Sequence, residues 1–158
     1  MSKRSQFSTV VGALICLTGC GALDNCPDSR DPISITHGKT DKEKLVYEST
    51  PWGGPLDHFP AKTALWFRHD FGVVPFTSVP FLSFSSVGTG NEGGGSVALT
   101  AGNQTLVDCV DKRVIVLRND TCEPSFYVRL TVLGESLLAD EEVDCCANMQ
   151  ELEACQDP

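Results

Sequence analysis

Apolar and polar residues alternate with a period of two in the second half of the chain, which is the period of a β-strand. Residues 126–133 give the clearest case, because one face of this segment carries Phe126, Val128, Leu130 and Val132. Successive side chains of a strand point to opposite faces of a sheet. The segment is therefore predicted to bury one face in a core and to turn the other toward solvent.

Five other segments combine β-branched and aromatic residues with flanking turn formers, and each predicts a strand. They are residues 63–68, 79–87, 96–100, 105–110 and 113–117, the last two joined by a hairpin-like turn at Asp111 and Lys112. The shorter segments 33–35 and 45–47 are candidates for further strands. No long helical pattern separates these segments, which argues against a parallel α/β sheet. The pattern predicts a mainly β protein, an antiparallel β-sandwich of about six to eight strands.

The C-terminal segment, residues 134–158, has a different pattern, with eight acidic residues and no basic residue. Cys145, Met149 and Leu152 follow the helical spacing i, i+4 and i+7, and Asp140 can cap the start of a helix. We expect a short helix at about residues 141–154, held on the sandwich by disulfides. The alternative is an acidic disordered tail, which the three cysteines of the segment argue against.

The first residues have the layout of a secretory signal: Lys3 and Arg4, then an apolar run at positions 10–17. Leu17-Thr18-Gly19-Cys20 follows and resembles the lipobox of bacterial lipoproteins. The resemblance covers residues 1–20 and implies that Cys20 is lipidated and becomes the first residue after cleavage. Position 21 is Gly. The aspartate that retains members of that family at the inner membrane is absent, which favours the outer membrane.

The resemblance divides the chain into a signal peptide, residues 1–19, and an anchored protein. Residues 20–61 contain five prolines and a Gly-Gly pair, a composition typical of a tether, here with possible short strands. Residues 62–133 are expected to form the β-sandwich core. Residues 134–158 are expected to form the acidic, cysteine-rich segment with its short helix.

Eight cysteines in 158 residues are many for a protein of a reducing compartment. Cys16 leaves with the signal peptide and Cys20 carries the lipid, so an even number remains. Three disulfides are predicted, with the connectivity open, although Cys109 with Cys122, and Cys26 with the C-terminal cluster, are plausible pairs. The candidate disulfide residues are Cys26, Cys109, Cys122, Cys145, Cys146 and Cys155.

The composition provides a core but an acidic surface. Hydrophobic residues make up 41% of the chain, while 12 basic residues stand against 21 acidic ones, for a net charge of −9. This charge argues against binding to a nucleic-acid backbone. It also opposes contact with an anionic lipid surface, so we expect the bilayer to be reached through acylated Cys20 alone.

The sequence carries no signature of a catalytic site, a cofactor or a metal centre. Residues 88–93 match G-x-G-x-x-G, but Gly94 and Gly95 follow where a pyrophosphate site needs a helix. His37, His58 and His69 could ligate a metal or transfer protons, yet none has the spacing of a known metal motif. We expect no cofactor and no enzymatic activity.

Aromatic residues concentrate in residues 52–76. Core packing accounts for such a cluster, but exposed rings also anchor interfaces and stack on sugars, so Trp52 and Trp66 are candidate binding residues. We expect a non-enzymatic envelope lipoprotein that binds or scaffolds an envelope protein or glycan. The alternative is a carbohydrate-binding or adhesin-like domain, and a third hypothesis is a metal-dependent enzyme that uses the histidines.

Overall fold

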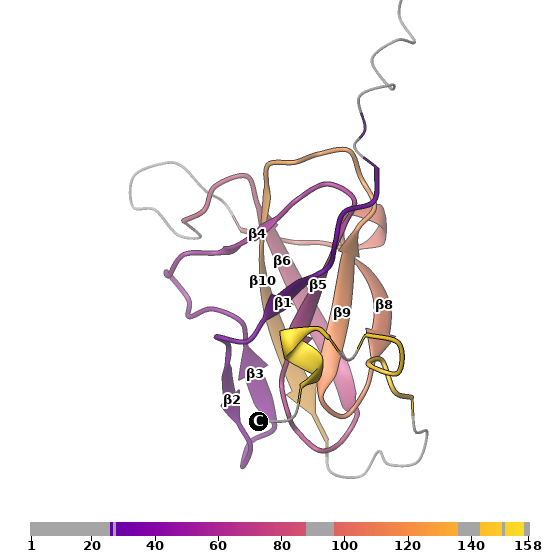
Figure 1. The fold of residues 1–158 in the computed structure, drawn as a ribbon. Helices are drawn as coiled ribbons and strands as arrows, with labels where there is room; N and C mark the ends of the chain where they lie inside the picture. Colours follow the sequence, from indigo (N-terminus) through magenta and orange to yellow (C-terminus); the bar gives the residue numbers. More distant parts are fainter. Residues whose placement is uncertain (1–25, 27, 88–96, 136–142, 150, 157–158) are drawn as a thin grey trace, which may run out of the picture.

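Two β-sheets packed face to face form the protein, as predicted (Figure 1). The computed structural model describes residues 26, 28–87, 97–135, 143–149 and 151–156. The signal peptide, Cys20 and the glycine-rich residues 88–93 lie outside these residues. The described part contains ten strands rather than six to eight. None of its helices is long and apolar enough to cross a membrane.

The first sheet, sheet A, has four strands in the order β1-β5-β9-β8. β1 runs parallel to β5, and the other pairs are antiparallel. The turn at Asp111 and Lys112 joins β8 to β9, as expected. The bounds are β1 Ile33–Ile35, β5 Thr63–Arg68, β8 Leu106–Val110 and β9 Val114–Asn119, with a 3-10 turn, η2, at Gly102–Gln104 before β8.

The second sheet, sheet B, has the order β2-β3-β10-β6-β7, and β4 pairs with the beginning of β10. All its pairs are antiparallel. The long strands β6 and β10 lie side by side at its centre. The bounds are β2 Lys39–Asp41, β3 Val46–Glu48, β4 Asp57–Phe59, β6 Pro75–Ser83, β7 Ala98–Leu99 and β10 Phe126–Gly134.

The sandwich begins earlier in the chain than expected. Strands β1 to β4 lie within residues 33–59, which were expected to belong to a tether with possible short strands, and they take part in both sheets. The candidate strands at 33–35 and 45–47 form as β1 and β3. The prolines and glycines of this stretch mostly separate short strands. Gly38 shows one reason for a glycine here, because a Cβ at this position would lie 2.3 Å from the hydroxyl of Tyr47.

The main core lies between the sheets and confirms the alternation predicted for β10. Phe126, Val128, Leu130 and Val132 are all buried in it. Sheet A contributes alternate residues of β5 and β9, and the neighbouring strands add large side chains. These further core residues include Tyr47, Phe59, Leu65, Phe67, Ile115 and Leu117.

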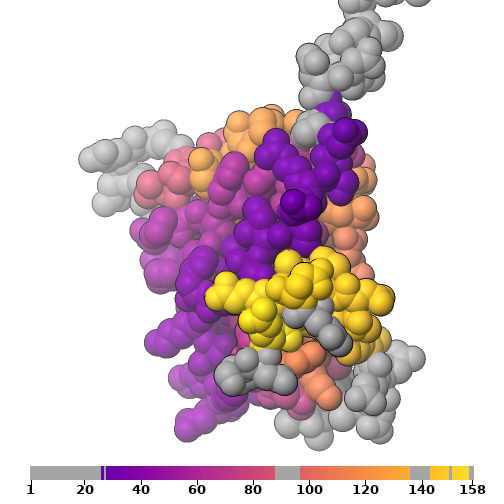
Figure 2. All heavy atoms as spheres, viewed as in Figure 1, coloured from indigo at the N-terminus to yellow at the C-terminus, as the bar shows by residue number. Residues whose placement is uncertain are grey.

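A second, smaller core lies on the outer face of sheet A, where the C-terminal segment covers it. Trp66, Val114 and Val116 pack there against Cys146 and Cys155. Figure 2 shows the segment, in yellow, as a patch over the strands behind it. Cys145, Met149 and Leu152 also pack against this cluster, so the predicted buried face is correct.

The predicted C-terminal helix is wrong. The described part of the segment has turns and a 3-10 turn, η3, at Glu153–Cys155. The disulfide between Cys146 and Cys155 gives the reason, because their Cα atoms are 5.5 Å apart. An α-helix would separate residues nine positions apart by about 13 Å along its axis, too far for a disulfide.

Three disulfides form, as predicted, and they join Cys26 to Cys122, Cys109 to Cys145, and Cys146 to Cys155. The two pairings favoured from the sequence do not occur. Cys109 lies on the edge strand β8, beside the C-terminal segment, and bonds to it. Cys122 lies in the connection between β9 and β10, next to the point where the N-terminal part of the chain enters the sandwich.

Candidate functional site

The two outer faces of the sandwich differ in how far their side chains are covered. The C-terminal segment buries part of the outer face of sheet A, whereas the outer face of sheet B keeps many apolar side chains half-buried or exposed. The register places residues of β4, β6, β7 and β10 on this face. They include His58, Val79, Phe81, Leu99, Tyr127 and Leu133.

Trp52 lies over this face and remains 57% exposed. It belongs to the loop between β3 and β4, and its ring meets the ring of Phe81 edge-on with centroids 5.1 Å apart. Beneath it, the guanidinium carbon of Arg129 lies 4.0 Å from the centre of the Trp52 ring. We call Trp52, Phe81 and Arg129, with Glu48 and Thr50 that bind Arg129, the Trp52 platform.

Arg129 is buried although it points out of the sheet. Its guanidinium donates hydrogen bonds to the carboxylate of Glu48 and to the main-chain carbonyl of Thr50. Burial lowers the pKa of Arg129, and the charge of Glu48 opposes this effect. The positive charge is therefore matched inside the protein, and its main role is to hold Trp52 through a cation–π contact.

Polar atoms without a partner gather at the same place. Thr50 Oγ1, Thr131 Oγ1 and Arg129 Nε are buried and have no hydrogen bond within the described part of the protein. Thr131 is paired across the sheet with Glu48, and the carbonyl of Thr50 accepts from Arg129, so both residues adjoin the Arg129–Glu48 pair. Buried polar atoms are normally satisfied, by protein, water or ligand. The platform thus combines an exposed ring with buried polar atoms that no described group satisfies.

Trp66, the second candidate binding residue, does not reach this face. It lies on β5, is 7% exposed, and packs under the C-terminal segment on the opposite sheet. Its ring therefore stabilises the second core and offers no surface to a ligand. The sequence alone does not separate the two tryptophans, because their exposure depends on where the C-terminal segment lies.

His69 is fully buried and serves the structure. Its Nδ1 accepts a hydrogen bond from the N–H of Phe71 at 3.2 Å, so Nε2 carries the proton and donates to the carbonyl of Asp111 at 3.1 Å. Burial lowers the pKa of His69 to about 4. The ring is therefore neutral near pH 7 and joins the chain after β5 to the β8–β9 turn.

His37 contacts a buried carboxylate. Its Nε2 lies 2.9 Å from Oδ1 of Asp57, whose pKa is raised by burial although His37 and Ser49 act in the opposite direction. The hydroxyl oxygen of Ser49 accepts the N–H of Leu130 at 3.0 Å. Ser49 is itself buried, so this group does not have the geometry of a Ser-His-Asp triad.

His58 lies at the edge of the outer face of sheet B, with its ring 5.2 Å from that of Tyr127. Its Nε2 donates to the carbonyl of Pro124 at 2.9 Å. The three histidines therefore contact different elements. In the described residues, one group of three potential metal ligands is found within 4.8 Å: Asp111, Asp144 and Cys146. The sulfur of Cys146 belongs to a disulfide, which removes it as a ligand.

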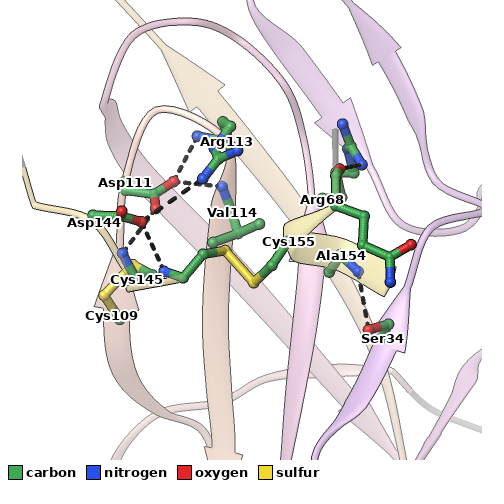
Figure 3. The surroundings of a disulfide bond; sticks show 12 residues. Ser34, Arg68, Cys109, Asp111, Arg113, Val114, Asp144, Cys145, Ala154 and Cys155 are labelled. Carbon is green, nitrogen blue, oxygen red and sulfur yellow. Dashed lines mark hydrogen bonds and ion pairs between the residues drawn. A yellow bond between two sulfur atoms is a disulfide. The ribbon is translucent and has the colours of Figure 1, made fainter. Parts of the chain in front are cut away.

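Asp111 attaches the C-terminal segment to sheet A (Figure 3). One carboxylate oxygen accepts the N–H groups of Arg113 and Val114, at 2.6 and 2.7 Å, and the other accepts the N–H of Cys145 at 2.9 Å. Sequence reasoning identified this residue only as part of a turn. An acidic residue in a hairpin turn does not indicate which distant N–H it will accept.

The Trp52 platform is thus the described feature that combines an exposed aromatic ring with a buried support. No protein-family model, curated protein or solved structure matches this chain. A function therefore has to follow from the platform, the disulfides and the amino-terminal sequence.

Proposed function

We propose that the protein is a non-enzymatic lipoprotein of the bacterial cell envelope, anchored through acylated Cys20, which binds another envelope component at the Trp52 platform. The observation that carries the binding role is Trp52 itself. It is a large ring, 57% exposed, that Arg129 and Phe81 hold in place. A ring that is already held loses little conformational freedom when a partner covers it.

The cysteine pairing supports the export that this proposal requires. Every cysteine after Cys20 belongs to a disulfide. Such bonds persist in the periplasm and on cell surfaces but are rare in the cytosol. The lipobox resemblance at Leu17-Thr18-Gly19-Cys20 supplies the anchor.

A neutral carbohydrate is the second candidate ligand. The charge of Arg129 is matched by Glu48, so the platform has no free charge of its own to attract an ionic ligand. The exposed Trp52 ring can stack on the apolar face of a sugar. The unpartnered hydroxyls of Thr50 and Thr131 are buried, so the ring itself is the group that a sugar would contact.

The anchor is tested by the intact mass of the protein extracted from the membranes of its own host, with and without reduction. We expect a chain that starts at Cys20, carries the mass of its acyl groups, and gains about six protons on reduction. A full-length chain with free thiols would contradict the anchor and the export.

The platform is tested by placing a photocrosslinking amino acid at position 99 in cells, with position 76 as the matched control. Leu99 is 69% exposed and pairs with Phe81 across the sheet, so this position leaves Trp52 in place. Phe76 is 51% exposed and lies near the beginning of β6. We expect a defined crosslinked species at position 99 that is absent at position 76. The same product at both positions, or none at position 99, would contradict a binding role.

The carbohydrate hypothesis has its own assay, which is binding of neutral polysaccharides to the wild type and to the Trp52→Phe and Trp52→Ala variants. Stacking on a sugar predicts that Trp52→Phe keeps part of the affinity and that Trp52→Ala loses it. Wild-type protein that binds no polysaccharide would leave a protein component of the envelope as the partner.

A further inference from the structure

The disulfide between Cys26 and Cys122 determines where the chain enters the sandwich. The N–H of Arg30 then donates to the carbonyl of Lys62 at 3.0 Å, immediately before β5. Cys122 follows β9 and precedes β10, so this is the end of the sandwich at which β9 ends and β10 begins. In Figure 1 the first described residues, in indigo, lie at this end. We call it the anchor end.

The spacer between the lipid and this end is short. Six positions separate Cys20 from Cys26. An extended chain spans at most about 3.6 Å per residue, so a lipid on Cys20 and the bonded Cys26 lie within about 20 Å of each other. The nine residues of β10 span about 30 Å, so the spacer cannot bring the far end of the sandwich to the membrane without turning the domain over.

Two apolar side chains are exposed at the anchor end of sheet B. Phe84 is 73% exposed and directly follows β6, with its ring 5.1 Å from that of Phe126 at the start of β10. Val87 is 49% exposed and forms a bridge with Pro55. The N–H of Leu56 donates to the carbonyl of Ser86 at 2.8 Å, and this bond holds the residues after β6 against the loop before β4.

The charges at this end are mixed. Lys62 pairs with Asp120 at 3.0 Å, and the exposed side chains include Arg30 beside Asp28 and Asp31. Among the residues that the structure describes, this end therefore has no basic cluster that would select anionic lipids. Apolar contact with the bilayer interface does not require a basic cluster. Aromatic side chains are favoured at the boundary between the headgroups and the acyl chains.

We propose that the anchor end rests on the bilayer that holds the lipid, with Phe84 and Val87 entering the interfacial region. This inference rests on the proposed acylation of Cys20. The net charge led us to expect that the lipid alone attaches the protein to the membrane. This inference adds a second attachment, through side chains of the protein. The strands then stand upright on the membrane, and the Trp52 platform faces along the bilayer surface rather than into it.

The test uses the Phe84→Trp and Phe76→Trp variants of the lipidated protein. These positions lie at opposite ends of β6, eight residues or about 26 Å apart, and both side chains are more than half exposed. Each protein is reconstituted into phosphatidylcholine vesicles with and without brominated acyl chains, which quench tryptophan at short range. The signal of Trp52 and Trp66 is measured on the wild type and subtracted.

We expect the tryptophan at position 84 to shift its emission to shorter wavelength on reconstitution and to lose intensity with brominated lipid. The tryptophan at position 76 should do neither. Acylated, vesicle-bound protein in which position 84 is quenched no more than position 76 would overturn this orientation and leave the anchor intact. Protein whose intact mass shows no acyl group would overturn the anchor and, with it, this inference.

Discussion

The guanidinium carbon of Arg129 lies 4.0 Å from the centre of the Trp52 ring, which makes an arginine on an outer sheet face almost fully inaccessible. Each residue depends on the other. Arg129 is buried because Trp52 lies across it, and Trp52 keeps its place because Arg129 and Phe81 hold it. Stability and the proposed binding role are therefore coupled at this pair.

Replacement of Arg129 by alanine should destabilise the protein by about 3 kcal/mol, because the change removes the partner of Glu48 and the support of Trp52. Urea denaturation of the variant measures this loss. Lys42→Ala, an exposed change in the turn between β2 and β3, is the control and should be nearly neutral. Equal stability of the two variants would show that the buried guanidinium contributes nothing.

Stability should fall as the pH decreases from about 6.5 to about 4, because of His69. The folded state lowers the pKa of this ring to about 4, while an unfolded chain titrates near 6.5. Between these values the unfolded state binds more protons, so acid favours unfolding, by about 3 kcal/mol at most. Asp57, whose pKa is raised, acts in the opposite direction at lower pH.

His69→Gln tests this assignment, because glutamine can keep hydrogen bonds but does not titrate. Denaturation curves between pH 4 and pH 7 should show a shallower loss of stability for the variant than for the wild type. Parallel curves would mean that another group controls the dependence.

Loss of the disulfides should cost different amounts of stability. Cys26 and Cys122 close a loop of 96 residues, and their removal should cost about 5 kcal/mol. Cys146 and Cys155 close a loop of nine, and the pair of alanine substitutions there should cost about 2–3 kcal/mol. Thermal unfolding of both double variants measures the two losses of stability. A loss for the Cys26–Cys122 pair that is no larger than the loss for the Cys146–Cys155 pair would contradict the dependence on loop length.

Opening the C-terminal segment should expose Trp66. Asp111→Ala removes the acceptor of Cys145 N–H and of two turn N–H groups, with an expected loss of about 2–3 kcal/mol. Hydrogen exchange in residues 143–156 should become faster than in the wild type, and the emission of Trp66 should move to longer wavelength. Unchanged exchange would show that the disulfides alone hold the segment.

The sequence predicted the features that depend on the local spacing of apolar residues. The alternation of Phe126, Val128, Leu130 and Val132 follows from the geometry of one strand, and these residues are buried as expected. The same reasoning identified which side of the C-terminal segment packs, but not its conformation. A 5.5 Å separation of two Cα atoms imposed by a disulfide overrides a spacing that suits a helix.

Features that depend on distant partners could not be predicted. Trp52 and Trp66 look alike as residues, yet one is exposed and the other lies under residues that follow it by more than 70 positions, from Cys145 onward. Arg129 was assigned only to the solvent side of a strand. Its burial requires a loop from the other half of the chain to fold across it.

The different partners of the adjacent residues Cys145 and Cys146 have a consequence for biogenesis. Cys145 must bond to Cys109, and Cys146 must bond to Cys155. If the two neighbours exchange partners, the chain forms an isomer with bonds from Cys109 to Cys146 and from Cys145 to Cys155. Thiolate attack on a formed disulfide interconverts such isomers. Oxidative folding therefore includes a choice between neighbouring sulfurs, and the yield of native protein should depend on a disulfide isomerase.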